Sequence, residues 1–279
     1  MISILTFLVI LFLIFTNGIT DASNSVATVI GTKVLSYRKA CFLSGILNAI
    51  GVLVMYLMNP SVSSTISEIV MLPVSQTGSM ILIIASLVTI LFSFVSAFNG
   101  IPASESYGLI FGLIGATIAT FGTTKIHTQK VFLIMLGVVF SLVGTSLIST
   151  IIKKKITQMI QAMSTKQNKL MQLLSCFSMS FAHGAQDGLK FIGLLKLYQT
   201  MPNCFWIGEW EIVLLCASIL AIRNDDRRQE NHHYSRTETS QTGQFQCTDF
   251  RNEHRFYSHF RKYNGSSLKH ESCQDNCMC

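Results

Sequence analysis

Long apolar segments alternate with short polar ones along the first 222 residues of the chain. The first segment, MISILTFLVILFLIF, contains no charge and continues into a second apolar stretch after a short polar interruption. About 20 consecutive apolar residues suffice to cross a bilayer as a helix. The pattern predicts an all-α polytopic membrane protein with segments at 2–16 running into 17–31, 40–58, 79–98, 108–122, 131–152, a stretch within 156–198, and 204–222. A cleaved signal peptide is the alternative for the first segment, which lacks a basic leader and a small-residue cleavage site.

The alternation stops at residue 222, and the composition changes there. Of the 279 residues 49% are hydrophobic and 13% charged, with a mean hydropathy of +0.46, which is too apolar for an ordinary soluble protein. Residues 223–279 nevertheless carry nine Lys/Arg, eight Asp/Glu and five of the seven His. The net charge of +7 therefore comes mostly from the loops of the first part. We see no basic stripe with interleaved aromatics, and we expect no nucleic-acid binding.

Basic residues predict the orientation and the boundaries of the chain's regions. They gather at 33–39 and at 153–169, whereas the loop 59–78 has none. The positive-inside rule places the two basic regions, 33–39 and 153–169, in the cytoplasm and the loop 59–78 outside. We expect a first transmembrane repeat at 1–152, a cytoplasmic basic amphipathic linker at 153–175, the start of a second repeat at 176–222, and a polar Cys/His tail at 223–279.

Two similar polar motifs interrupt the apolar pattern. NGITDASNSVATVIG begins at Asn17, and HGAQDGLKFIG covers 183–193. Each places an aspartate, Asp21 or Asp187, among small and polar residues, where an ionisable group in a membrane is costly and marks a functional site. Helix breaks in corresponding places of two halves are typical of a transporter binding site. We therefore expect broken helices at both motifs, with an ion or anion held between them.

A third interruption reads FNGIPASESYGLIFGLIGA, residues 98–116. Gly100 and Pro102 are expected to end the preceding helix, and Ser104, Glu105 or Ser106 to cap the next one. The alternative is a plain tight loop between two spans. The small residues that follow favour close helix packing, and they are Gly108, Gly112, Gly115 and Ala116.

These three motifs resemble those of the inorganic phosphate transporter (PiT) family. NGITDASNSVATVIGT is similar to GANDxANsvaT, GIPASESYGLIFGLIGA to GxPxSTTHalxGaxxGA, and SFAHGAQDGLKFIG to SFxHGxNDaqKxxG. The resemblance covers roughly residues 1–222. It implies secondary transport of orthophosphate coupled to sodium or a proton, by two inverted repeats of broken or re-entrant helices, the second repeat being incomplete here. The chain departs from the family at Thr20, Gln186, Glu105, Ser106, Tyr107 and Leu189.

The candidate site residues follow from the motifs. Phosphate needs several hydrogen-bond donors and a positive local field, which helix N-termini and hydroxyls supply. Asp21, Asn24 and Asp187 are candidates for a co-transported sodium, or the aspartates accept a hydrogen bond from protonated phosphate. We expect His183 to be either a packed helix histidine or a proton carrier. The full candidate set is Thr20, Asp21, Asn24, Ser104, Glu105, His183, Gln186, Asp187 and Lys190, where buried Lys190 is expected to need Asp187 as its partner.

The tail allows three interpretations. It is a disordered cytosolic segment, a metal-binding segment, or a product of a shifted reading frame. Its possible zinc ligands do not form the C-x-x-C spacing of structural zinc sites, and they are Cys247, His254, His259, His270, Cys273, Cys277 and Cys279.

The shifted-frame interpretation rests on a hidden motif. Read one nucleotide later, codons for YNGSSLKHESCQDN can give ITGLPLSTNHAKTT, which contains a GxPxST motif. Its proline falls at Ser267, 80 residues after Asp187, whereas Pro102 follows Asp21 by 81 residues. We therefore expect a frameshift just after Ile222. If the cell contains this frameshift, the product lacks a wall of the site and is expected to be inactive.

The function predicted first is a phosphate permease of the plasma membrane working by cation symport. Another oxyanion such as sulfate is left open as the substrate, and so is a membrane-anchored metal-binding or interaction protein that uses the Cys/His tail. We expect no enzymatic activity and no cofactor beyond the co-transported ion. The expected partners are phosphate and the lipid bilayer, with homodimer formation left open.

Overall fold

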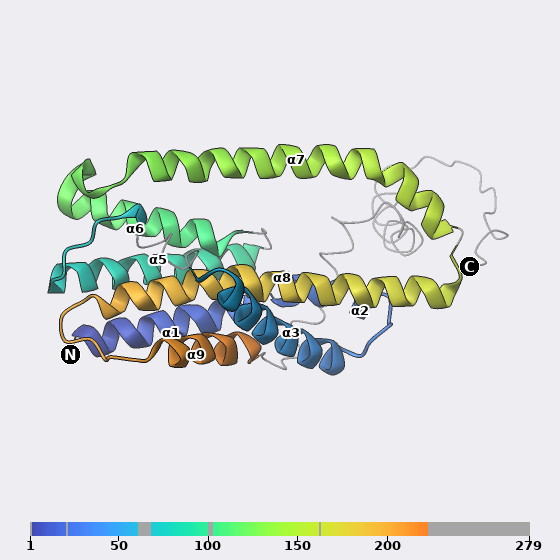
Figure 1. Cartoon of the computed structure of the whole chain (residues 1–279), viewed down its shortest axis with the longest axis horizontal. Helices are drawn as coiled ribbons and strands as arrows, with labels where there is room; N and C mark the ends of the chain where they lie inside the picture. Colours follow the sequence, from blue (N-terminus) through green and yellow to red (C-terminus); the bar gives the residue numbers. More distant parts are fainter. Residues whose placement is uncertain (1, 21, 61–67, 100–102, 162, 223–279) are drawn as a thin grey trace, which may run out of the picture. The chain divides into compact units, whose positions relative to one another are not determined.

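Each apolar segment of the sequence forms a helix in the computed structural model (Figure 1). The structure describes residues 2–20, 22–60, 68–99, 103–161 and 163–222. The chain divides into two units, Met1–His233 and Tyr234–Cys279, and all the described residues belong to the first. The expectations for the tail, including its zinc ligands, therefore also lie outside the described residues. The elements are α1 (Ile2–Thr20), α2 (Ala22–Gly31), α3 (Tyr37–Met58), α5 (Gln76–Asn99), α6 (Glu105–Phe121), η2 (Gly122–Lys125), α7 (Thr128–Gln161), α8 (Thr165–Gln199) and α9 (Glu209–Ala221).

The predicted fold class, an all-α polytopic membrane protein, is confirmed. Helices α1, α3, α5, α6 and α7 are long and apolar enough to cross a membrane. The described residues contain no strand apart from an isolated bridge between Val70 and Ile126. This bridge joins the loop before α5 to the loop after α6, where the Met71 amide donates to the Lys125 carbonyl at 2.8 Å.

The three predicted helix interruptions have different outcomes. The first falls on Asp21, which lies outside the described residues; α1 passes through Asn17 and Gly18 and ends at Thr20, and α2 begins at Ala22. The second prediction is wrong, since α8 is one unbroken helix from Thr165 to Gln199 (Figure 1). The third is confirmed, because α5 ends at Asn99 and α6 begins at Glu105. The backbone therefore continues as a helix through the second acidic motif.

The predicted linker at 153–175 is divided between two helices. Helix α7 continues to Gln161, and α8 starts at Thr165. Ser164 caps α8 with a capping box, in which its hydroxyl accepts from the Gln167 amide and Gln167 Oε1 accepts from the Ser164 amide at 2.9 Å. Reciprocal capping of this kind satisfies two amide groups at a helix start, so it fixes where the new helix begins.

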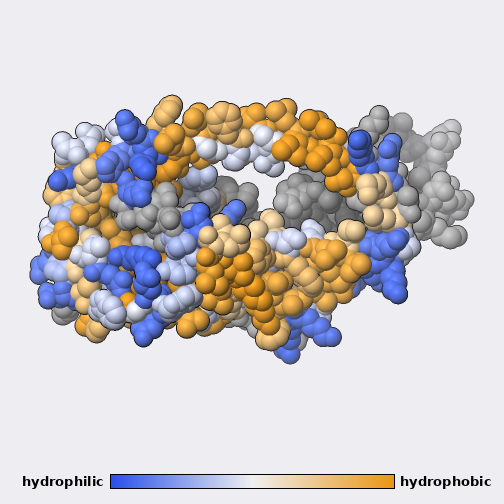
Figure 2. All heavy atoms as spheres, viewed as in Figure 1, coloured by the Kyte–Doolittle hydropathy of each residue, from blue (hydrophilic) through white to orange (hydrophobic). Residues whose placement is uncertain are grey.

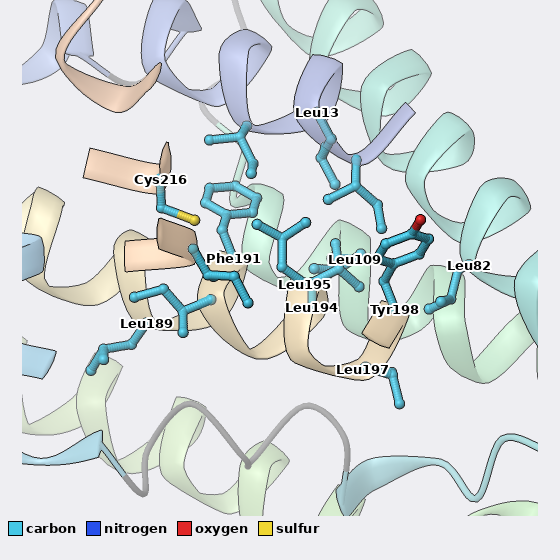
Figure 3. Packing of buried hydrophobic residues seen from close by; sticks show 14 of the residues in the cluster. Leu13, Leu82, Leu109, Leu189, Phe191, Leu194, Leu195, Leu197, Tyr198 and Cys216 are labelled. Carbon is cyan, nitrogen blue, oxygen red and sulfur yellow. The ribbon is translucent and has the colours of Figure 1, made fainter. Parts of the chain in front are cut away.

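The second half of α8 forms the centre of the apolar core (Figure 3). Phe191, Leu194, Leu195 and Tyr198 are at most 1% exposed. Figure 3 shows them among side chains from other helices, which include Leu13 of α1, Leu82 of α5, Leu109 of α6 and Cys216 of α9. The hydroxyl of Tyr198 lies 2.9 Å from Ser3 Oγ, and the Phe205 amide donates to it at 3.1 Å. The core thus gathers α1, α5, α6 and α9 around one helix.

Glycines bring α3 and α8 into backbone contact. A Cβ atom at Gly184 would overlap the backbone of Asn48, and one at Gly51 would overlap the carbonyl of Phe181. A Cβ at Gly188 would lie 2.5 Å from Val52 Cγ2. Small residues of this kind allow helices to approach closely in membranes. The glycines of the second acidic motif therefore serve packing, which is one reason that α8 does not break there.

The predicted small face of α6 is confirmed in part. A Cβ at Gly108 would lie 3.1 Å from the ring of Phe92, and one at Gly112 would lie 3.1 Å from the Ala85 carbonyl oxygen. Gly115, in contrast, has no neighbour within 4 Å. Ala116, one residue further along, is buried in the core. The predicted small face is therefore packed at Gly108, Gly112 and Ala116 but not at Gly115.

Helix α7 differs from the core helices because none of its described residues is buried. Its large apolar side chains are exposed, and they include Phe132, Phe140, Leu142 and Ile151, which are 66–74% exposed. Figure 2 shows hydrophobic side chains along this helix. Apolar surface of this extent on a helix of 34 residues suits contact with lipid chains.

Candidate functional site

Three side chains on the middle of α8 form a buried charged cluster. Lys190 Nζ lies 2.9 Å from Asp187 Oδ1, and His183 Nε2 lies 3.3 Å from Asp187 Oδ2. Positions three and four residues apart share one helix face, so the spacing His-x-x-x-Asp-x-x-Lys directs all three groups to the same place. The side chains are only 10–17% exposed. The predicted pairing of Lys190 with Asp187 is therefore present.

Lys190 also connects α8 to the start of α6. Its Nζ donates to Ser106 Oγ at 3.1 Å and lies 4.7 Å from the centre of the Phe191 ring. A buried ammonium is stable only when it is paired and hydrogen-bonded, and Lys190 meets this requirement with groups from two helices. This contact brings the third sequence motif to the second one.

The first turn of α6 places a carboxylate beside this junction. Ser104 is the N-cap residue of α6, as predicted, but its side chain makes no capping hydrogen bond. Glu105 is the first residue of the helix and is only 3% exposed. A carboxylate is favoured at a helix N-terminus, where the dipole is positive. The helix start thus accounts for a buried Glu105 in a largely apolar protein.

The remaining predicted residues are not brought into this cluster. Asp21 and the side chains of Thr20 and Asn24 lie outside the described residues. Gln186, although adjacent to Asp187, has an exposed side chain, because consecutive residues on a helix point about 100° apart. Asp187, Lys190 and His183 therefore form the described cluster, and Ser104 and Glu105 directly precede Ser106, the α6 residue that Lys190 contacts.

Sequence reasoning missed a polar seam between α2, α3 and α8. Ser44 Oγ donates to Ser180 Oγ at 2.6 Å and lies 3.2 Å from Ser25 Oγ. Asn48 lies one turn after Ser44 and is completely buried. The signal was available, because Ser44 and Asn48 are polar residues four apart inside the apolar segment 40–58, on the same face of the predicted helix.

A second missed cluster lies near the other end of α8. Lys196 Nζ lies 3.1 Å from Glu209 Oε1 and donates to Tyr56 Oη at 3.3 Å. The rings of Tyr56 and Trp210 meet edge to face, with centroids 5.8 Å apart. These contacts attach the start of α9 to α3 and α8. Lys196 and Glu209 were not among the candidate residues predicted from the sequence.

The chemical capacity of the described site follows from its charges. In this state both oxygens of Asp187 face a nitrogen, one of Lys190 and one of His183. No group of three or more His, Cys, Asp or Glu in the described part of the chain could hold a metal ion. The site combines an ammonium, a hydroxyl and a helix start, which are groups that hold oxyanions in proteins.

Comparison with known proteins adds independent information. A family model described as "Phosphate transporter family" matches residues 17–222. The chain is similar to proteins named "Probable low-affinity inorganic phosphate transporter" from three bacteria. It is 26% identical over 194 residues to one from Bacillus subtilis, covering 68% of this chain and 57% of the relative. It is 27% identical over 226 residues to one from Rhizobium meliloti, covering 77% and 65%.

The third relative, from Streptomyces halstedii, is 32% identical over 178 residues, covering 62% of this chain and 81% of that protein. The chain spans about half the length of most of the curated relatives that it matches. No solved structure matches it significantly. The matched region begins at the first acidic motif and ends where the hydrophobic pattern stops.

Proposed function

Because the chain belongs to the phosphate transporter family, we propose that it forms part of a permease that moves inorganic phosphate across a membrane by symport with a cation. It is an integral membrane protein, with five helices suited to cross a bilayer. The co-transported cation in this proposal is sodium or a proton. The relatives' names support phosphate as the substrate, and the family is one of transporters, in agreement with the expectation that the chain is not an enzyme.

The observation that carries the proposal is that the Lys190 ammonium contacts both Asp187 of its own helix and Ser106 of α6. Its ammonium is paired with Asp187 at 2.9 Å and bonded to Ser106 at 3.1 Å. An incoming phosphate competes with Asp187 for this ammonium, because charge-assisted bonds to phosphate are strong. Once Lys190 turns to phosphate, Asp187 is left as a buried charge that requires a cation. Anion and cation binding therefore support each other, which is the requirement for symport.

The first experiment is uptake of radiolabelled phosphate in bacterial cells that lack their own phosphate permeases. The experiment uses the chain with its reading frame restored after Ile222. The proposal predicts uptake that depends on sodium or on the proton gradient when Asp187 is present, and loss of that uptake in Asp187→Asn. The matched control is Ser218→Ala, because Ser218 is exposed and bonds only to the Leu215 carbonyl of its own helix. Uptake that is equal in Asp187→Asn and in the unaltered protein would contradict the proposed role of the carboxylate.

Competition by unlabelled oxyanions determines the substrate class in the same cells. Phosphate and its close analogue arsenate are expected to reduce uptake, while sulfate at equal concentration has little effect. Sulfate that competes as well as phosphate would favour the general oxyanion permease instead. Replacement of sodium by choline, and collapse of the proton gradient by an uncoupler, identify the coupling ion.

The shifted-frame hypothesis requires a different experiment. The family match ends at residue 222, which is the position that sequence reasoning assigned to the shift. Nucleotide sequencing of the native gene across the codons for Leu220 to Asn224 is expected to leave a GxPxST motif readable in the shifted frame. The 279-residue chain and a version with the frame restored after Ile222 should then be compared for uptake. We expect transport from the restored version, whereas uptake by the 279-residue chain alone would contradict the predicted loss of activity.

A further inference from the structure

A chain of hydroxyl groups joins three helices beside the candidate site. Ser44 of α3 donates to Ser180 of α8 at 2.6 Å, and Ser25 of α2 lies 3.2 Å from Ser44. All three residues are at most 5% exposed. Each hydroxyl has a partner within the chain, so these groups alone do not require a ligand.

Asn48 lies one helical turn further along α3 and is not satisfied in this way. The residue is 0% exposed, and neither Nδ2 nor Oδ1 has a hydrogen-bond partner in the structure. Buried polar atoms without partners are rare, and each requires an explanation. The facing residue of α8 cannot provide one, because it is Gly184, which has no side chain and contacts the backbone of Asn48.

The acidic cluster does not offer free oxygens to a cation in this state. Lys190 occupies one oxygen of Asp187, and His183 lies against the other. A cation that enters before phosphate therefore needs other ligands. The Asn48 amide oxygen and the Ser44 hydroxyl, one turn apart on the same helix face, are neutral oxygen ligands. Divalent cations are usually bound through carboxylates, so a neutral set favours a single positive charge.

We propose that Asn48 Oδ1, together with Ser44 Oγ, binds a sodium ion next to the contact between α3 and α8. Nδ2 of Asn48 then donates to a water molecule that the ion retains. This inference rests on the proposed function, since it locates the binding site of one coupling ion. It assigns that ion to the empty transporter, before phosphate releases Lys190 from Asp187.

The test measures sodium binding without phosphate. The full chain is placed in lipid nanodiscs, and its Tm is followed as sodium chloride replaces choline chloride at constant ionic strength. We expect a saturable rise in Tm. The variant Asn48→Leu has nearly the same volume and no polar atoms. We expect it to keep or raise the Tm in choline, because an unsatisfied amide is removed, and to need roughly tenfold more sodium or to lose the response.

The matched control is Ser86→Ala on α5, because Ser86 is also 0% exposed with a hydroxyl that has no partner in the structure. It is expected to retain the full sodium response. If Asn48→Leu does not fold, Asn48→Asp serves instead, and its carboxylate should lower the half-saturating sodium concentration. No saturable response in the unaltered chain, or an unchanged half-saturation in the Asn48 variants, overturns the inference.

The same measurement distinguishes this inference from the proposed function. A sodium response that Asn48→Leu abolishes, in a protein that shows no phosphate uptake when its frame is restored, leaves the cation site standing and contradicts the transport proposal. Phosphate uptake without any sodium response contradicts the cation site alone and leaves a proton as the coupling ion.

Discussion

The two acidic motifs are alike in sequence but differ in the charges around their aspartates. NGITDASNS spans the end of α1 at Thr20 and the start of α2 at Ala22, and its Asp21 lies outside the described residues. HGAQDGLKF lies inside one continuous helix. The second motif has a histidine four residues before its aspartate and a lysine three residues after it, and both contact the carboxylate. The first motif has no basic residue within four positions of Asp21. In the second motif, the helix that carries the aspartate also carries the basic groups that compensate its charge.

The largest expected effect comes from removing the close contact that holds the continuous motif in place. Gly184→Leu inserts a side chain where even a Cβ overlaps the Asn48 backbone. We expect the free energy of unfolding to fall by at least about 3 kcal/mol, the upper range for overpacking. Size-exclusion profiles and thermal unfolding in detergent measure this. Gly144→Leu on α7 is the control, because Gly144 has no neighbour within 4 Å, and equal damage by both variants would contradict the packing argument.

Removing the charge of Lys190, which compensates Asp187, should destabilise the second motif. Lys190→Met leaves Asp187 buried without its ammonium, and we expect a loss of about 3–5 kcal/mol in the free energy of unfolding. Hydrogen exchange of the amides in 183–190 should accelerate at the same time. The double variant Lys190→Met with Asp187→Asn removes both charges and is expected to recover most of the loss. A double variant as unstable as the single one would show that Lys190 acts through packing rather than charge.

A smaller effect is expected from the hydroxyl chain that anchors α2, the helix after the first motif. Ser44→Ala removes the bonds to Ser180 and Ser25 at an expected cost of about 1 kcal/mol, typical of interhelical hydrogen bonds in membranes. Chemical denaturation in mixed micelles measures the difference. Ser141→Ala, whose hydroxyl bonds only to the Val138 carbonyl of its own exposed helix, is expected to be neutral in the same assay.

The smallest effect is expected at Gln186, the residue directly before Asp187. Gln186 is exposed, whereas its neighbour Asp187 is 8% exposed. Gln186→Ala should change the free energy of unfolding by less than about 0.5 kcal/mol, as surface substitutions usually do. A larger loss, measured by the same denaturation, would mean that Gln186 contributes to the packed cluster.

The lengths of the apolar segments were enough to predict the helices, because in a membrane helix length and apolar character follow from the thickness of the bilayer. The break before α6 was also predictable, since Gly100 and Pro102, which lie outside the described residues, are two helix terminators within three residues. The pairing of Lys190 with Asp187 was predictable because a buried lysine needs a partner and Asp187 is near it in the sequence.

The continuity of α8 was not predicted because similarity to the first motif was given more weight than the local charge pattern. His183 and Lys190 had been noted as neighbours of Asp187, but their ability to neutralise it within the helix was not used. The seam of Ser25, Ser44 and Ser180 depends on which helices meet, with Ser180 lying 136 residues after Ser44. Pairing at that separation is set by tertiary packing, which a single sequence does not reveal.

The uninterrupted backbone of α8 has a mechanical consequence. With 35 residues it is about 52 Å long at 1.5 Å per residue, whereas the hydrocarbon core of a bilayer is about 30 Å thick. Near its start Gln172 accepts from Thr32 at 2.7 Å, and near its end Lys196 meets Glu209 at 3.1 Å. Because no helix break lies between these two contacts, α8 moves as one rigid helix. A rotation applied at one end of α8 therefore turns the Asp187 cluster and the other end of the helix through the same angle.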